Sequence, residues 1–362
     1  MGKTLVLGTK KGLLLLDEGA RAWRTRPIQH GGIAVSYAFH DARTGTFWAA
    51  LDHGHWGSKL SRSEDGAAWE EVAAPAYPEG TVTPCTKKPA ALRYVYVLAP
   101  GHASQPQRLY VGTVPGGLFM SDDGGASFSL VTSLFEHPTK ERWFQGGKDF
   151  DDPGLHSVVV DPRDAGRVLV GISSAGVMAT RDGGATWTPS NKGLKNDYIP
   201  ESEAEVGHDP HFVMACEAEP DVVWQQNHCG VFRSTDGGAT WTDVGQAKGS
   251  GPVRFGFPIA ADAQDPERAW VVPATSDERR YAVDGAMCVA RTDDGGKSWS
   301  VMREGLPQDD CYDVVYRHAL DARGDTVVFG TTTGNLYLSE DRGERWRCLG
   351  ANFPPILSVR FV

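Results

Sequence analysis

The chain has 362 residues, a formal net charge of −10, and 43 glycines and 22 prolines that are spread along its whole length. The acidic balance, with no basic cluster to offset it, argues against nucleic acid as a partner. The N-terminal stretch MGKTLVLGTKKG has no signal-peptide apolar run and no segment reaches transmembrane length, so we expect a cytoplasmic protein that does not contact a membrane.

Short apolar segments separated by turns run along the chain and group into fours. The first group has three members, Thr4–Leu7, Gly12–Leu16 and the segment around Trp23, and the strand that it lacks is Ile356–Val362 at the other end. Pairing of the last strand with the first would close a ring of sheets and cover both sheet edges. The inner strands of the other groups are expected, in chain order, from Ile33 and at Arg93–Leu98, His156–Val160, His211–Cys216, Phe255–Ala260 and Tyr312–Tyr316.

An eight-residue pattern, here called the repeat turn, follows the third strand of each group. Its clearest copy is STDGGATW at Ser234–Trp241. A Ser or Thr, an Asp and two glycines favour a hairpin turn in which the carboxylate accepts backbone N–H groups and glycine takes a positive φ. The aromatic residue that ends the pattern is expected to pack between neighbouring sheets. Further copies are Ser63–Trp69 (shortened), Ser121–Phe128, Thr180–Trp187, Thr292–Trp299, Ser339–Trp346 and a degenerate copy that ends at Trp23.

The copies recur every 47 to 59 residues, which is room for four short strands and their loops. The pattern resembles the Asp-box, or BNR, repeat of sialidases, sortilin-type receptors, xyloglucan-cleaving endoglucanases and a photosystem II assembly factor. The chain is also similar to bacterial BNR-repeat, sialidase-like "glycosyl hydrolase" proteins. This resemblance implies an all-β, seven-bladed β-propeller whose repeat turns are structural. We therefore predict one domain over residues 1–362, with blade 1 shared between residues 1–27 and 356–362.

Three insertions lengthen the otherwise short connections between the repeated strands, at Thr132–Leu155, Pro189–Pro210 and Thr275–Met287. They fall on connections that share one face of the predicted disc, opposite the repeat turns. Long loops on a rigid scaffold usually carry binding and catalytic groups. We therefore predict a polar pocket on this face, at the mouth of the propeller channel.

Eight of the eleven histidines are expected on the same face. His156 and His211 open inner strands of adjacent blades, and antiparallel pairing brings His228 close to His211. Imidazoles that converge from several strands suit a divalent metal such as zinc. The predicted metal ligands are His55, His156, His211 and His228, with Asp152 and Asp209 completing the shell or orienting a histidine. The same residues also fit a histidine general base without metal, or ordinary hydrogen-bonded turn histidines.

The remaining candidates are polar or aromatic loop residues. Ser276–Arg280, together with Arg254, would bind a carboxylate or phosphate through bidentate hydrogen bonds, or would be a solvated charged loop. The predicted catalytic residues are His156, His211, His228, Asp152, Glu278 and Arg279. The predicted substrate-binding residues are Trp143, Tyr198, Arg254 and Tyr312.

Three functions remain open from the sequence. The main interpretation is a hydrolase of small esters, lactones or phosphoesters that uses a histidine-bound divalent metal or a histidine base. The second is a glycoside hydrolase, although the F/Y-R-I-P motif of sialidases is absent and the nearest fragment is Arg26–Pro27. The third is a non-catalytic propeller that binds a protein partner. The carboxylates considered for the glycosidase are Asp149, Asp151, Asp152, Glu201, Glu203, Glu205 and Glu278.

Overall fold

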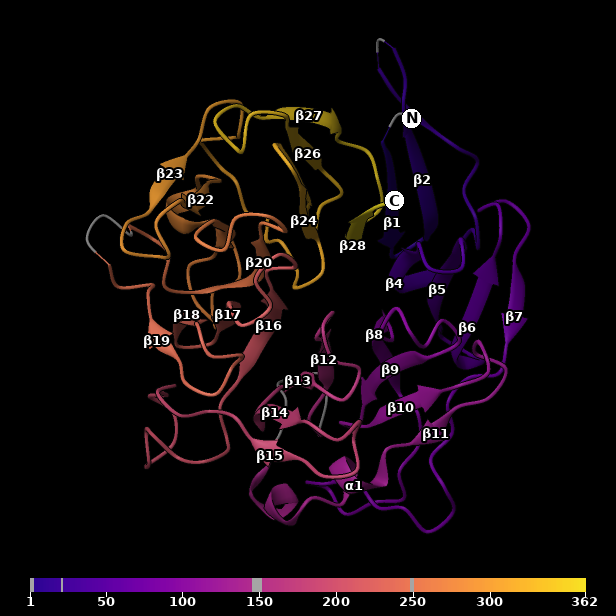
Figure 1. Ribbon diagram of the computed structural model, residues 1–362. Helices are drawn as coiled ribbons and strands as arrows, with labels where there is room; N and C mark the ends of the chain where they lie inside the picture. Colours follow the sequence, from indigo (N-terminus) through magenta and orange to yellow (C-terminus); the bar gives the residue numbers. More distant parts are fainter. Residues whose placement is uncertain (1–2, 21, 145–151, 248–250) are drawn as a thin grey trace. The chain divides into compact units, whose positions relative to one another are not determined.

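The computed structural model describes residues 3–20, 22–144, 152–247 and 251–362. Within these residues the chain forms seven four-stranded antiparallel sheets, numbered here as blades 1 to 7 in chain order (Figure 1). The sheets belong to two compact units, a first unit of Met1–Gly32 with His211–Val362 and a second unit of Ile33–Pro210. Seven meandering four-stranded sheets make a seven-bladed β-propeller, so the predicted fold class is confirmed.

The first unit contains four blades. Blade 1 consists of β28 (Ile356–Phe361), β1 (Thr4–Thr9), β2 (Gly12–Glu18) and β3 (Trp23–Thr25). Blade 5 consists of β16 (Pro210–Ala215), β17 (Val223–Asn227), β18 (Gly230–Ser234) and β19 (Thr242–Asp243). Blade 6 consists of β20 (Gly256–Ala261), β21 (Ala269–Pro273), β22 (Val289–Thr292) and β23 (Ser300–Met302). Blade 7 consists of β24 (Leu320–Arg323), β25 (Thr326–Gly330), β26 (Leu336–Ser339) and β27 (Arg347–Gly350).

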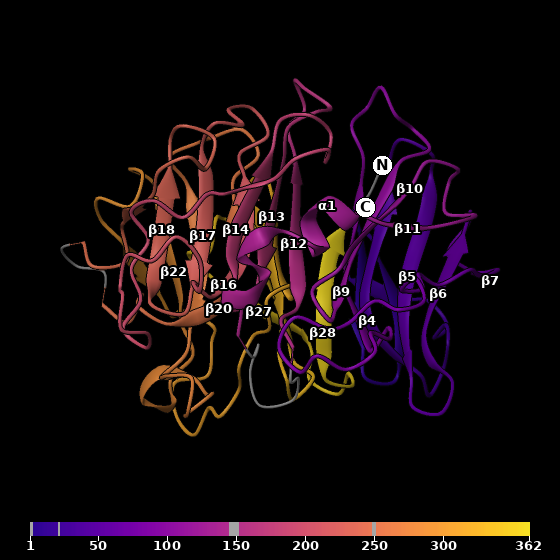
Figure 2. The same cartoon turned by 90° about the horizontal axis from the view of Figure 1, so that it is seen from below.

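The second unit contains three blades. Blade 2 consists of β4 (Ala34–Asp41), β5 (Thr46–His53), β6 (Gly57–Ser63) and β7 (Glu70–Val72). Blade 3 consists of β8 (Tyr94–Pro100), β9 (Leu109–Val114), β10 (Leu118–Ser121) and β11 (Ser129–Leu130). Blade 4 consists of β12 (Leu155–Val160), β13 (Val168–Ile172), β14 (Gly176–Thr180) and β15 (Thr188–Pro189), and Figure 2 shows β12, β13 and β14 side by side.

Helices are short and few among the described residues: α1 (Thr132–Phe135) and two 3-10 helices at Pro138–Arg142 and Val283–Gly285. In the described part of the chain, no helix combines the length and the apolar character that a bilayer crossing requires. The first two helices fall in the Thr132–Leu155 insertion, and α1 buries Leu134 and Phe135. This insertion therefore adds to the hydrophobic core of the second unit.

The predicted pairing of the chain ends is confirmed. β28 pairs antiparallel with β1, from Leu5 opposite Phe361 to Thr9 opposite Ile356, and Figure 1 shows the two strands together. Ile356 and Val359 are fully buried in this strand. The last strand of the sequence is therefore the inner strand of the first blade.

The predicted inner strand of blade 7 is wrong. Tyr312–Tyr316 belongs to no strand, and the inner strand is β24, which pairs with β25 across the two-residue turn Gly324–Asp325. The apolar run at Tyr312–Tyr316 suggested a strand, but a tight turn with glycine at a φ of 59° fixes the pairing of the residues that flank it. The segment Tyr312–Tyr316 is instead part of a long loop between β23 and β24.

Tryptophans on the second strands of blades 5 and 6 contact the repeat turn of the blade that follows. Trp270 of blade 6 is fully buried, and its Nε1 donates to the carbonyl of Arg342 in the repeat turn of blade 7, at 2.8 Å. Trp224 of blade 5 packs edge-on against Trp299, which ends the repeat turn of blade 6, with ring centroids 6.5 Å apart. Trp299 in turn donates to the carbonyl of Val244 in blade 5. The expected position of the repeat-turn aromatic between neighbouring sheets is confirmed in this case.

The repeat turn at Ser234–Trp241 has the predicted hairpin geometry. Asp236 Oδ1 accepts the Thr240 N–H at 2.8 Å, and Ser234 Oγ accepts the buried Gly238 N–H at 2.9 Å. Gly238 has a φ of 84°, a left-handed value that favours glycine. The serine, rather than the aspartate, therefore satisfies the buried N–H, and the carboxylate holds the exposed end of the turn.

The contribution of the repeat-turn carboxylates to stability can be tested by lowering the pH. Hydrogen bonds from the side chain and backbone of Thr186 lower the pKa of Asp182 to about 2, from an ordinary value of 3.8. Because the folded chain favours the charged form, this group contributes stability that is complete above about pH 4 and is lost as the pH falls toward about 2. We expect the urea midpoint of Asp182→Asn to fall less between these pH values than that of the wild type. Equal acid slopes for Asp182→Asn, the wild type and the exposed-site control Glu79→Gln would contradict this account.

Candidate functional site

Two histidines and two phenylalanines form one packed cluster in the first unit. His211 lies on β16, and His228 lies on the two-residue turn that joins β17 to β18. Phe255 directly precedes β20 and Phe257 is its second residue, and the two rings meet edge-on with centroids 5.4 Å apart. These four residues are called the His–Phe cluster below.

The rings of the cluster contact one another directly. His211 stacks on Phe257 with ring centroids 4.8 Å apart and an interplanar angle of 20°. His228 meets His211 and Phe255 edge-on, with centroids 5.6 Å away in each case. The guanidinium groups of Arg280 and Arg317 lie over the Phe257 ring, 5.5 and 5.6 Å from its centroid. The cluster therefore combines imidazole, aromatic and cationic groups.

Backbone and carboxylate groups orient the two imidazoles. Nδ1 of the buried His211 lies 2.6 Å from the carbonyl oxygen of Gly256. A carbonyl can only accept, so Nδ1 carries a proton in this bond, and in the neutral form of the ring Nε2 is the nitrogen with the lone pair. Nε2 of His228 lies 3.7 Å from a carboxylate oxygen of Asp277, and the side chain of Asn227 accepts the Cys229 N–H at 3.0 Å and shapes the turn that carries His228.

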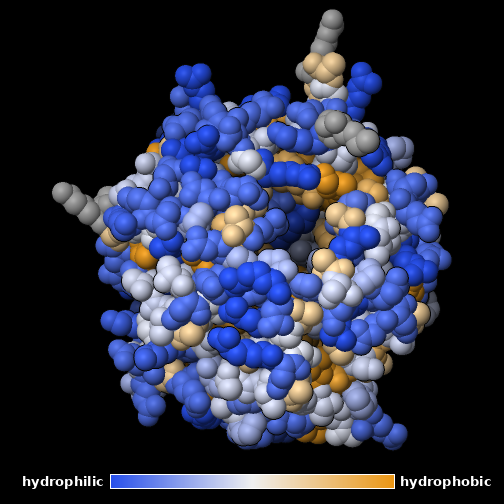
Figure 3. All heavy atoms as spheres, in the orientation of Figure 1, coloured by the Kyte–Doolittle hydropathy of each residue, from blue (hydrophilic) through white to orange (hydrophobic). Residues whose placement is uncertain are grey.

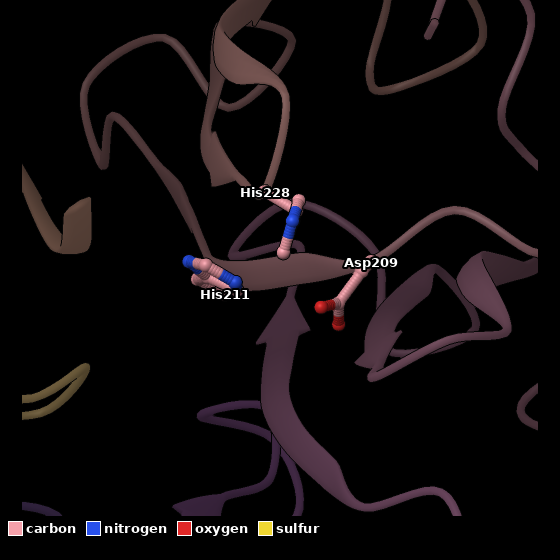
Figure 4. Close-up of side chains that lie close together, drawn as sticks. All are labelled: Asp209, His211 and His228. Atoms are coloured by element: carbon pink, nitrogen blue, oxygen red, sulfur yellow. The ribbon is translucent and has the colours of Figure 1, made fainter. Parts of the chain in front are cut away.

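Asp209 directly precedes β16 and lies close to His211 and His228. Asp209, His211 and His228 each offer one ligand atom, and the three atoms lie within 4.8 Å of one another. Figure 4 shows His228 extending from its turn toward the strand that carries His211, with the Asp209 carboxylate beside them. Among the described residues this is the group whose geometry suits a metal ion. The predicted proximity of His211 and His228 is thus present in the structure.

The other two predicted metal ligands lie elsewhere. His55 is exposed on the turn between β5 and β6, in the second unit. His156 is fully buried on β12, where its Nδ1 lies 2.9 Å from the Ser157 hydroxyl and its ring meets Tyr96 edge-on. Neither residue belongs to the group formed by Asp209, His211 and His228.

Asp152 has a structural set of contacts. It is almost fully buried, and its carboxylate accepts the backbone N–H groups of Cys85 and Thr86, at 2.9 and 3.2 Å. It also accepts the Thr86 hydroxyl at 3.1 Å. Burial, together with the nearby Asp152 charge, raises the pKa of Cys85 to about 11. Asp152 therefore fixes the loop that contains Cys85, and its oxygens already receive three donors there.

The predicted substrate-binding residues differ in exposure. Trp143 is only 4 % exposed and donates from Nε1 to the Thr139 hydroxyl, so its ring belongs to the core of the second unit. Tyr198 is 37 % exposed and donates to the carbonyl of Gly207. Arg254 is exposed beside the His–Phe cluster, and Tyr312 is 65 % exposed. Asp149 and Asp151, two of the carboxylates considered from the sequence, lie outside the described residues.

Two loops of the first unit pack against each other. The loop between β21 and β22 carries the predicted Glu278 and Arg279, both exposed, together with Asp277. The loop between β23 and β24 contacts it through the Cys311 N–H, which donates to the Gly285 carbonyl at 2.8 Å, and the Met287 N–H, which donates to Pro307. Together residues 274–288 and 303–319 are called the paired loops below.

An aromatic pair lies where the paired loops meet. The rings of Tyr281 and Tyr312, one from each loop, are 5.8 Å apart at an angle of 67°. Large hydrophobic side chains are otherwise sparse on the described surface, and the face drawn in Figure 3 is mainly hydrophilic with small apolar patches. The sequence prediction did not include Tyr281 or the second loop, because Tyr312–Tyr316 was interpreted as a strand.

Comparisons with known proteins give one sequence relative and several similar folds. No family model matches the chain. It is 25 % identical over 282 residues to an oligoxyloglucan-reducing end-specific xyloglucanase from Emericella nidulans, a match that covers 68 % of this chain and 31 % of the relative. The chain therefore spans about a third of the length of that relative.

The solved structures show the fold. A GH74 xyloglucanase from Xanthomonas campestris has a TM-score of 0.65 and 16 % identity, over 96 % of this chain and 52 % of that protein. A structure of YCF48 bound to D1 peptide has a TM-score of 0.51 and 15 % identity, over 91 % of this chain and 85 % of that one. The chain thus resembles GH74 xyloglucanases and YCF48 in fold, as a seven-bladed β-propeller with a distant glycoside hydrolase relative in sequence.

Proposed function

We propose that the protein is a glycoside hydrolase that acts on a xyloglucan-type polysaccharide and binds it over the paired loops. The observation that carries the proposal is the sequence match to the xyloglucanase, at 25 % identity over 282 residues. This match favours the glycosidase over the hydrolase of esters, lactones or phosphoesters, which has no comparable sequence relative here.

The surface of the paired loops suits a sugar chain. Tyr312 presents most of its ring to solvent, and Tyr281 stands against it from the other loop. Aromatic rings offer an apolar face with a polar edge, which matches the mixed C–H and hydroxyl surface of a sugar ring. A polysaccharide chain would therefore bind on this surface through ring stacking and through hydrogen bonds from the polar groups around it.

Carboxylates for the chemistry lie on both loops. Glycoside hydrolysis generally uses two carboxylic acids, one that protonates the leaving oxygen and one that acts as base or nucleophile. Asp277 and Glu278 lie on the first loop, and Asp309 and Asp310 lie on the second, all of them exposed. Asp277 also lies beside the His228 ring. We assign the acid and the base to this set, one from each loop.

The test is an assay of polysaccharide hydrolysis that measures the release of reducing ends. We expect the full chain to cleave xyloglucan, and Asp277→Asn, Glu278→Gln, Asp309→Asn and Asp310→Asn to identify two residues whose loss lowers kcat by about 100-fold or more. The matched control is Glu79→Gln, an exposed carboxylate of the second unit that should keep full activity.

Two outcomes would reject the proposal. One is the absence of turnover by the folded full chain on xyloglucan, unbranched β-glucans and aryl glycosides. The other is unchanged activity in all four variants. Recovery of a specific bound protein in the absence of any turnover would instead favour the non-catalytic binding propeller.

A further inference from the structure

The group of Asp209, His211 and His228 has no part in the proposed sugar chemistry. Its three ligand atoms lie within 4.8 Å of one another, at the start of β16 and on the neighbouring β17–β18 turn (Figure 4). We propose that these three residues bind a divalent transition-metal ion of the zinc class. This inference does not depend on the glycosidase proposal.

The chemistry of the donors selects the class of ion. Two imidazole nitrogens and one carboxylate oxygen are the ligands that zinc and its first-row neighbours prefer, whereas calcium and magnesium prefer all-oxygen shells. Three protein ligands also leave one position of a tetrahedral ion open to water. The group therefore fits a zinc-like ion with one exchangeable ligand.

His211 is already prepared for this role. Its Nδ1–H is donated to the Gly256 carbonyl at 2.6 Å, and stacking on Phe257 holds the plane of the ring. A metal-binding histidine commonly donates its other ring N–H to a carbonyl or carboxylate, which fixes the tautomer and raises the basicity of the ligand nitrogen. His211 would thus bind the ion through Nε2 while Nδ1 keeps its bond to the Gly256 carbonyl.

The other two ligands have room to adjust. Ligands around a tetrahedral ion with bonds near 2.1 Å stand about 3.4 Å apart, so the three atoms must approach one another slightly. His228 and Asp209 are only partly buried, unlike His211. Asp209 Oδ1 accepts the Ser174 N–H at 3.2 Å, so the shell would close through small rotations that bring the second carboxylate oxygen to the ion. The Asp277 carboxylate beside His228 adds a second negative charge near the ion and would favour its binding.

The test is metal binding by tag-free, chelator-treated full-length protein. We expect zinc titrated by calorimetry to bind with one ion per chain, and cobalt to show the visible absorption of a four-coordinate ion. His228→Gln and Asp209→Asn should each weaken zinc binding by about 100-fold or more. The matched control is His55→Ala, which removes an exposed histidine of the second unit and should leave binding unchanged.

Circular dichroism of each variant would check that the fold is retained. The two variants replace partly buried residues, because replacement of the buried His211 would disturb the His–Phe cluster itself. Absence of one-to-one zinc binding by the wild type, or wild-type affinity in both folded variants, would overturn the proposal. These titrations use no substrate, so a failed glycosidase assay leaves their result unaffected.

Discussion

A chain that lacks Ile356–Val362 should not reach the native state. β28 supplies the inner strand of blade 1 and pairs with β1 along its length. Its loss would uncover the buried faces of Leu5 and Leu7 together with the unpaired backbone of β1, and exposed strand edges of this kind lead to aggregation. The deletion would also remove the side chain of Arg360, which donates to the carbonyls of His318 and Leu320 in the adjoining segment of blade 7.

Size-exclusion chromatography and thermal melting would measure this effect. We expect the truncated chain to be insoluble, or to elute as aggregates without a cooperative transition. A control chain that lacks only Val362 keeps every β28 residue and should melt close to the wild type. A monomeric truncated protein with the wild-type melting curve would show that the terminal pairing is dispensable.

Trp270→Ala should cost about 3–5 kcal/mol of unfolding free energy, the typical loss when a large buried aromatic is removed. The side chain is fully buried in blade 6, and its Nε1–H binds the Arg342 carbonyl in the repeat turn of blade 7. The substitution therefore leaves a cavity and removes a link between two blades. Trp270→Phe keeps most of the apolar contact and loses mainly the hydrogen bond, so we expect a smaller loss of about 1–2 kcal/mol.

Urea unfolding at equilibrium would give these differences. The control is Trp56→Ala, because Trp56 is 74 % exposed and its removal should change stability by less than about 0.5 kcal/mol. Equal effects of Trp270→Ala and Trp56→Ala would mean that the inter-blade contact does not contribute to stability.

The fold could be predicted because its signals are local and repeated. The side-chain hydrogen bonds within the repeat turn join residues at most four positions apart, as in Ser234 with Gly238 and Asp236 with Thr240. Short-range hydrogen bonds of this kind depend only on the order of residue types, so each copy of the pattern indicates one hairpin. The pairing of β28 with β1 also followed from the sequence, because blade 1 otherwise lacked a strand.

The strand pattern gave a wrong prediction where two neighbouring segments could each form the inner strand of blade 7. Tyr312–Tyr316 has the apolar character of a strand, yet β24 pairs with β25 because the turn at Gly324–Asp325 brings those residues together. The displaced segment became part of the paired loops and placed Tyr312 at the surface, next to Tyr281. Strand propensity alone could not reveal which of two neighbouring segments forms the hairpin.

The sequence by itself determined the repeat, the number of blades and the pairing of the chain ends, because these depend on turn chemistry and on periodic strands. Antiparallel pairing along the sequence also predicted that His228 lies near His211. Only the tertiary structure decided which of the other predicted ligands join them: Asp209 lies beside the two histidines, whereas His55 lies on an exposed turn and Asp152 binds the loop that contains Cys85. These outcomes depend on how neighbouring strands and blades pack, through contacts between residues far apart in the chain, and the residue pattern of a single strand carries no record of its neighbours.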